Sequence, residues 1–166
     1  MIQRVQSIYL ILAFICMTLL LFFPIFSVEM ETLTGDMSFT AVVGKDGVIG
    51  DGFEAGKFPL SNVFISLALL TVVTILLYKK RPRQLLMCRL NLILHFLLVV
   101  VIYAFYFFGK PFIQERIQSS IGEDVTVNFH MQLGFFFLIP TLAFLFLAVR
   151  GIKKDELLIK SLDRIR

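Results

Sequence analysis

The chain has 166 residues, of which 58% are hydrophobic and 17% are charged, and its mean hydropathy is +0.87. A soluble domain of this length has no interior large enough to bury that much apolar surface, so the composition excludes a soluble globular protein and indicates a membrane protein. The net charge of +4 does not indicate nucleic-acid binding, because the basic residues are confined to a few segments between apolar runs.

The first apolar run covers residues 5–26 and follows Arg4. It is longer than the ~7–15-residue hydrophobic region of a signal peptide, and no small-x-small cleavage site follows it. We therefore expect an uncleaved first transmembrane helix with its N-terminus inside.

Residues 27–59 form the larger of two polar loops expected outside. Residues 27–34 alternate between apolar and polar types, as a strand does. Two further strand-like segments flank the turn sequence Gly44-Lys45-Asp46-Gly47. Since a two-stranded hairpin is marginal in water, we expect a third strand to complete a small sheet.

Two runs of 19 residues, 60–78 and 90–108, predict a helical hairpin in the membrane. Each would measure about 28 Å as a helix, close to the thickness of the bilayer core. The turn between them holds five basic residues, and such clusters are retained in the cytoplasm. These residues are Lys79, Lys80, Arg81, Arg83 and Arg89. The first four have two possible roles, in setting topology or in binding anionic headgroups.

The second outer loop covers residues 110–130, and the fourth span covers residues 131–149. Pro111 predicts a helix start, Gly122 predicts its end, and residues 125–129 have the composition of a strand that would join the sheet. Within the span, Pro140 predicts a kink that leaves the carbonyl of Phe136 without its helical partner.

Residues 150–166 form a cytoplasmic tail, in which we expect an amphipathic helix on the membrane surface. Leu158, Leu162 and Ile165 recur at helical spacing and form one apolar stripe. Gly151 would let the chain turn as it leaves the fourth span. In the rival interpretation, the stripe docks on a cytoplasmic protein.

The charges divide according to this layout. The segments placed inside carry twelve Lys or Arg and three acids, a balance of +9, whereas the outer loops carry four bases and nine acids, a balance of −5. This asymmetry predicts that both termini are cytoplasmic. We therefore expect an all-α integral membrane protein: a single domain over residues 1–166, with four transmembrane helices, a small β-containing extracytoplasmic cap and a cytoplasmic amphipathic C-terminal helix.

The candidate site within the membrane is a polar face of the third span formed by Asn91, His95 and Tyr106. The three residues fall on nearly one side of a helix. An ionisable residue in a span is costly to bury, so a proton relay, a quinone contact or a headgroup contact is a functional interpretation. Because no span contains Asp or Glu, we favour a structural one, in which His95 and Asn91 bond across to Thr71, Thr74 or Ser7.

Motifs for catalysis or metal binding are absent from the sequence. His130 lies near Asp124 and Glu123, but no further ligand is placed to complete a metal site. There is no nucleophile elbow, P-loop, dinucleotide-binding glycine pattern or CxxC. Cys16 and Cys88 are at different depths, so no disulfide is expected. We therefore predict no enzymatic activity, no cofactor and no metal.

Four stretches of the sequence resemble a four-span membrane family of the Bacteroidota that is described only as a domain of unknown function. They are Met1-Ile2-Gln3-Arg4-Val5-Gln6-Ser7-Ile8-Tyr9-Leu10, Cys88-Arg89-Leu90-Asn91, residues 150–156 and residues 161–166. The resemblance implies the inner membrane of a bacterium and the same four-span layout. It implies no activity and no catalytic residues.

Two functions from different classes are compatible with these features. We expect a non-catalytic accessory or scaffolding subunit of a membrane complex, in contact with membrane lipids and other integral membrane proteins and not with nucleic acid. The alternative is a lipid- or quinone-binding protein with a cavity near His95.

Overall fold

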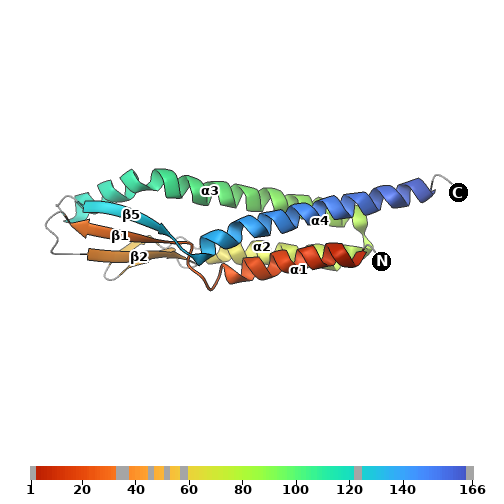
Figure 1. The fold of residues 1–166 in the computed structure, drawn as a ribbon, viewed down its shortest axis with the longest axis horizontal. Helices are drawn as coiled ribbons and strands as arrows, with labels where there is room; N and C mark the ends of the chain where they lie inside the picture. The colour runs from red at the N-terminus through yellow and green to blue at the C-terminus, as the bar shows by residue number, and fades with distance from the viewer. Residues whose placement is uncertain are drawn as a thin grey trace.

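The computed structural model describes residues 3–32, 38–44, 47–50, 53–56, 60–121 and 125–163. Its elements are α1 (Gln3–Leu19), β1 (Phe26–Thr32), β2 (Ser38–Gly44), β3 (Gly47–Gly50), β4 (Phe53–Gly56), α2 (Leu60–Leu76), the 3₁₀ helix η1 (Leu77–Lys79), α3 (Arg81–Ile121), β5 (Val125–Met131) and α4 (Leu133–Asp163). The helices form an elongated bundle with the sheet at one end, and the N-terminus and the α2–α3 connection lie at the other (Figure 1). We call these the sheet end and the basic end.

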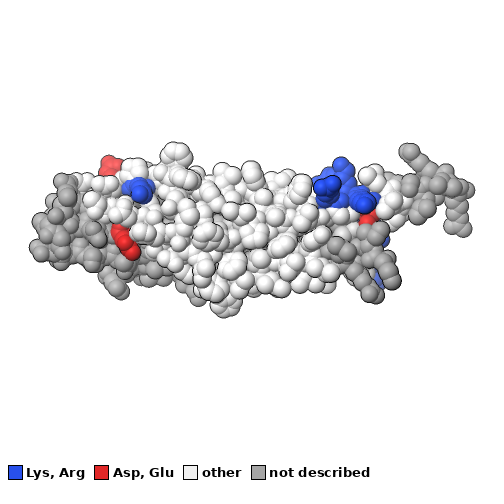
Figure 2. All heavy atoms as spheres, viewed as in Figure 1, with Lys and Arg blue, Asp and Glu red and all other residues white. Residues whose placement is uncertain are grey.

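Among the described residues, three helical segments are long and apolar enough to cross a membrane: Leu60–Lys79, Arg81–Phe112 and Leu133–Ile159. Only 28% to 33% of each is buried inside the protein, so most of their apolar surface faces outward. Figure 2 shows the same property from outside, with a long uncharged middle and charged side chains towards the two ends. The protein therefore has the surface of a membrane protein, with apolar side chains presented to lipid rather than to water.

The first helix is shorter than expected, because α1 ends at Leu19 rather than at residue 26. Its last turn tightens, with Leu21 N–H donating to Thr18 O and Phe22 N–H donating to Leu19 O. Pro24 disfavours helical backbone in the residue before it, and Phe26 already begins β1. The apolar run of residues 5–26 thus predicted an apolar helix here but not that the helix ends at Leu19.

The bundle and the sheet meet at a junction formed by Pro24, Ile25, Gln132 and Gly134. Gly134 N–H donates to Pro24 O at 2.9 Å, and Gln132 N–H donates to Ile25 O at 3.0 Å. On one side of this junction α1 packs against α4, and on the other β1 pairs with β5. The segment that runs from α1 into β1 therefore lies beside the segment that runs from β5 into α4, both in the bundle and in the sheet (Figure 1).

The sheet has five antiparallel strands in the order β4-β3-β2-β1-β5. The predicted hairpin is confirmed, with Gly44 opposite Gly47, and the strand of the second loop joins β1 as expected. Along β5, Val127 and Phe129 are buried, whereas Asn128 and His130 are exposed. This alternation turns one face of β5 towards α3, which packs along it.

α3 is one continuous helix of 41 residues, and this corrects two predictions made from the sequence. The basic turn is almost wholly helical, since η1 includes Lys79 and α3 begins at Arg81. Pro111 lies inside α3 instead of starting a separate helix. Proline removes only one helical hydrogen bond, and α3 packs against β5 in this region. Gly122 lies outside the described residues.

α4 is also continuous, so the expected turn at Gly151 and the separate tail helix are wrong. Gly151 serves another purpose: a Cβ there would lie 2.9 Å from Gln6 Cγ, so the glycine lets α1 approach closely. Ile152 is buried in the bundle, and Leu158 is exposed. Of the remaining predicted stripe, Ile165 lies outside the described residues.

The junction generates a stability prediction for Gly134→Ala. A Cβ on residue 134 would lie 2.5 Å from Pro24 O and 2.7 Å from Phe23 O, and neither backbone atom is free to rotate away. We expect a loss of about 1–3 kcal/mol, as in other overpacked sites, measured as a lower midpoint of thermal unfolding in detergent.

Gly109→Ala is the matched control, because Gly109 is also a buried helical glycine. A Cβ there meets only the Phe105 ring at an ordinary 3.5 Å. This substitution should leave stability unchanged or raise it by up to about 1 kcal/mol through helix propensity. Equal effects of the two substitutions would contradict the described junction.

Candidate functional site

Two groups of buried or partly buried polar side chains lie inside the mainly apolar bundle. The first, which we call the mid-bundle cluster, contains Thr71, Asn91 and His95. The second, the basic-end cluster, contains Gln6, Arg81, Gln84 and Asp155. The mid-bundle cluster draws its side chains from α2 and α3, and the basic-end cluster draws them from α1, α3 and α4. Each is therefore a candidate for holding the bundle together or for binding a ligand.

In the mid-bundle cluster, Asn91 joins α3 to α2. Its Nδ2 donates to Thr71 Oγ1 at 2.7 Å, and the Thr71 hydroxyl in turn lies 2.9 Å from the carbonyl of Leu67 on its own helix. Met17 Sδ of α1 lies 3.5 Å from the same hydroxyl. Both polar side chains are fully buried, so this contact between helices is shielded from competing water.

His95 joins α3 to α4 through a main-chain acceptor. Its Nε2–H donates to the carbonyl of Leu138 at 3.2 Å, rather than to Thr71, Thr74 or Ser7. A carbonyl can only accept, so in the neutral ring Nδ1 is left as an acceptor. His95 Nδ1 and Asn91 Oδ1, one turn apart on α3, are both buried without a hydrogen-bond partner in the described structure. The cluster thus retains two unused acceptors.

Tyr106 does not belong to this cluster, although the sequence placed it on the same face. It is half-buried near the sheet end, where its ring lies 5.7 Å from that of Phe135 and 5.8 Å from that of Phe129. Phe26 adds an edge-to-face contact at 6.2 Å. The structure therefore brings Asn91 and His95 together and assigns Tyr106 to the aromatic packing between bundle and sheet.

The basic-end cluster is centred on Asp155, which is 5% exposed. Gln6 of α1 donates its Nε2–H to Asp155 Oδ2, and Arg81 of α3 lies 3.7 Å from the same oxygen. Asp155 Oδ1 has no partner within the part of the chain that is described. Sequence reasoning missed this cluster because it ended the fourth helix before Gly151. The signal was Gln6, a polar residue within the first apolar run.

The other residues singled out in the sequence are more exposed. Lys79, Lys80 and Arg83 project from the surface, so Arg81 is the member of the basic turn that reaches the cluster. His130 lies 3.2 Å from Glu29 in an exposed pair at the sheet end. Across the described ranges, no group of three metal-ligating side chains forms, and Cys16 and Cys88 are unpaired thiols.

Comparison with known protein families supplies the identity that the site does not. The model of one family, DUF4293, a domain of unknown function, matches residues 2–165. The chain belongs to the DUF4293 family. No curated protein matches it. Membership therefore fixes the kind of protein without transferring an activity to the two polar clusters.

The bond between Asn91 and Thr71 in this DUF4293 protein can be tested by a double-mutant cycle with Asn91→Leu and Thr71→Val. The two substitutions should couple by about 0.6 kcal/mol, and by no more than ~1.7 kcal/mol, in thermal unfolding. Thr74→Val is the control, since the Thr74 hydroxyl donates to Leu70 O within its own helix. Additive effects of Asn91→Leu and Thr71→Val would show that the bond does not contribute.

The basic-end cluster predicts that Asp155→Ala is more harmful than a surface charge change. Removing the carboxylate leaves Gln6 and Arg81 without their shared acceptor and should cost about 1–3 kcal/mol. Lys153→Ala, on the exposed side of the same helix, should stay within about 0.5 kcal/mol. Asp155→Asn keeps an acceptor and should recover part of the loss. Indistinguishable melting curves for all three variants would contradict this role.

Proposed function

We propose that this DUF4293 protein crosses a bacterial inner membrane four times, with both termini and the basic end in the cytoplasm and the sheet outside. The packing of α1 against α4 supports a fourth crossing by α1. Its 17 residues measure about 26 Å, and the turn that follows adds the remainder of a bilayer core. The balance of +9 on one side and −5 on the other supports the orientation.

The length of α3 supports the same arrangement. From Arg81 to Phe108 it measures about 40 Å, which matches a bilayer with its interfacial regions. Phe107, Phe108 and Phe112 are strongly exposed where the helix would leave the membrane, as aromatic residues at an interface are. The rest of α3 then lies outside, beside the sheet.

Within this layout, we propose that the protein is a non-catalytic accessory or scaffolding subunit of a membrane complex. The observation that carries this proposal is the use of the interior polar groups, since Asn91, Thr71 and His95 all bond to neighbouring helix elements. Side chains committed to helix contacts are poor candidates for chemistry. The extensive outward apolar surface, with Phe96 and Phe146 among its exposed residues, suits contacts with other membrane proteins.

A second function, binding of a lipid or quinone beside His95, is favoured by one observation. Asn91 Oδ1 and His95 Nδ1 are both acceptors without partners. They would complement a hydroxyl donor, such as the reduced quinol form or a lipid hydroxyl, rather than the carbonyl oxygens of a quinone.

Purification in mild detergent followed by mass spectrometry separates these two functions. The scaffolding proposal predicts a stoichiometric protein partner that remains bound to the His95→Leu variant. The ligand-binding alternative predicts a quinol or lipid that is lost from His95→Leu and retained by His130→Leu, the exposed control. Recovery of the protein with a ligand of that kind and without a protein partner would overturn the scaffolding role.

The orientation predicts the labelling of single cysteines introduced after Cys16 and Cys88 have been replaced by alanine. A membrane-impermeant thiol reagent should label Asn128→Cys on β5 in intact spheroplasts and should label Arg83→Cys only after lysis. Both positions are exposed in the fold, so accessibility depends on the side of the membrane. Labelling of position 83 alone in intact spheroplasts would reverse the orientation.

A further inference from the structure

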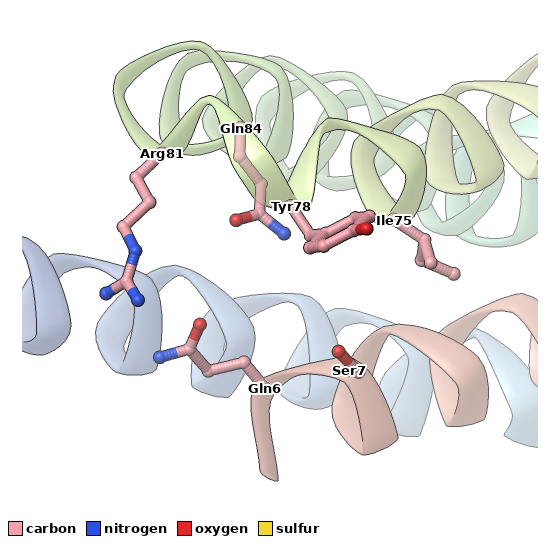
Figure 3. Close-up of a pocket in the computed structure, with 6 residues that line it drawn as sticks. All are labelled: Gln6, Ser7, Ile75, Tyr78, Arg81 and Gln84. Atoms are coloured by element: carbon pink, nitrogen blue, oxygen red, sulfur yellow. The ribbon is translucent and has the colours of Figure 1, made fainter. Parts of the chain in front are cut away.

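A pocket at the basic end has a chemistry that the scaffolding role does not require. It measures about 130 Å³ and lies between α1 and the α2–α3 connection. Its lining residues are Gln6, Ser7, Ile75, Tyr78, Arg81 and Gln84. Figure 3 shows Arg81 and Gln84 extending from one side towards Gln6 on the other. A single water needs only ~10–15 Å³, so the space admits a larger group.

Gln84 is the residue that points to a ligand. It is only 5% exposed, and its carboxamide is directed into the pocket (Figure 3). This carboxamide offers both N–H donors and a carbonyl acceptor to a polar group in the pocket.

Arg81 supplies the charge. Its guanidinium carries five N–H donors, and the contact of one terminal nitrogen with Asp155 leaves others available. Asp155 adds a negative charge nearby, but that carboxylate already accepts from Gln6 and faces Arg81. The exposed Lys79, Lys80 and Arg83 keep the surroundings positive. Arg81 is also the first residue of α3, where the helix dipole favours an anion.

The position of the pocket indicates where its ligand comes from. It lies at the basic end of the bundle, beside the α2–α3 connection (Figure 1). Ile75 lines it from the last turn of α2 and Tyr78 from η1, whereas Arg81 and Gln84 contribute polar groups from the first turn of α3. A headgroup phosphate occupies this depth in a bilayer, with the acyl chains beside the apolar helices.

We propose that this pocket binds one phosphate group, held by Arg81 and Gln84 with Gln6 at its opposite wall. The phosphate belongs either to an anionic phospholipid or to a free phosphate in the cytoplasm, because both present the same oxygens to the same donors. The proposal depends on the basic end lying at a membrane surface and is independent of any protein partner. Binding of this kind occurs at a single saturable site, in contrast to general electrostatic attraction of anions by the whole basic turn.

Native mass spectrometry of the full chain in detergent, with dioleoyl phosphatidylglycerol and inorganic phosphate added in separate titrations, tests the proposal. We expect one tightly bound lipid at low lipid concentration. Arg81→Gln should weaken this binding at least 10-fold, whereas Arg83→Gln, with the same loss of charge at an exposed position, should weaken it less than 2-fold. Saturable, Arg81-dependent binding of inorganic phosphate without binding of the lipid would support the site and identify free phosphate as its ligand.

Because Arg81 also contacts Asp155, Gln84→Leu is the second variant. It preserves the ion pair and the volume of the side chain and removes only the amide, so binding should fall several-fold while the melting temperature stays within a few degrees of that of the unmodified protein. Equal losses from Arg81→Gln and Arg83→Gln, or unchanged binding in a folded Gln84→Leu variant, would overturn the proposal.

Discussion

The rest of the fold depends on the backbone contact between Pro24 and Gly134. It is the point at which two neighbouring segments change together from helix to strand. Within lipid, a helix satisfies its own backbone groups, whereas strands must be paired with one another. Because both segments change at one level, the bundle stays helical and strand pairing is confined to the sheet end. The glycine is required because two carbonyl oxygens occupy the space of a side chain.

The polar interior shows how such a bundle is held together without a hydrophobic driving force between its helices. Asn91 links α3 to α2, His95 links α3 to α4, and Asp155 brings α1 and α3 together at the basic end. α3 takes part in every one of these contacts and also packs against the sheet. α3 is therefore the element that connects the basic end of the bundle to the sheet end.

Local patterns in the sequence predicted the three long apolar helices, the Gly44–Gly47 hairpin and the fifth strand. Run length, turn chemistry and alternation are visible in a few residues. The residues that usually end or bend a helix led to wrong predictions. Pro111 and Gly151 both lie inside continuous helices, and these helices also pack against segments distant in the sequence. The acceptor of His95 is a main-chain carbonyl, which carries no sequence signature. The Asp155 cluster depends on α4 continuing past residue 149, which a count of apolar residues does not reveal.

The order of the strands has a consequence for biogenesis. β1 is second from the edge of the sheet, and its outer neighbour β5 is synthesised only after α2 and α3. While the chain emerges, β1 can pair with β2 at once, but its other side stays open until most of the protein has been made. β5 can pair with β1 only shortly before α4, the last helix, is synthesised and packs against α1. The sheet is therefore completed late in synthesis, and a chain truncated before β5 would leave one side of β1 unpaired, which favours aggregation.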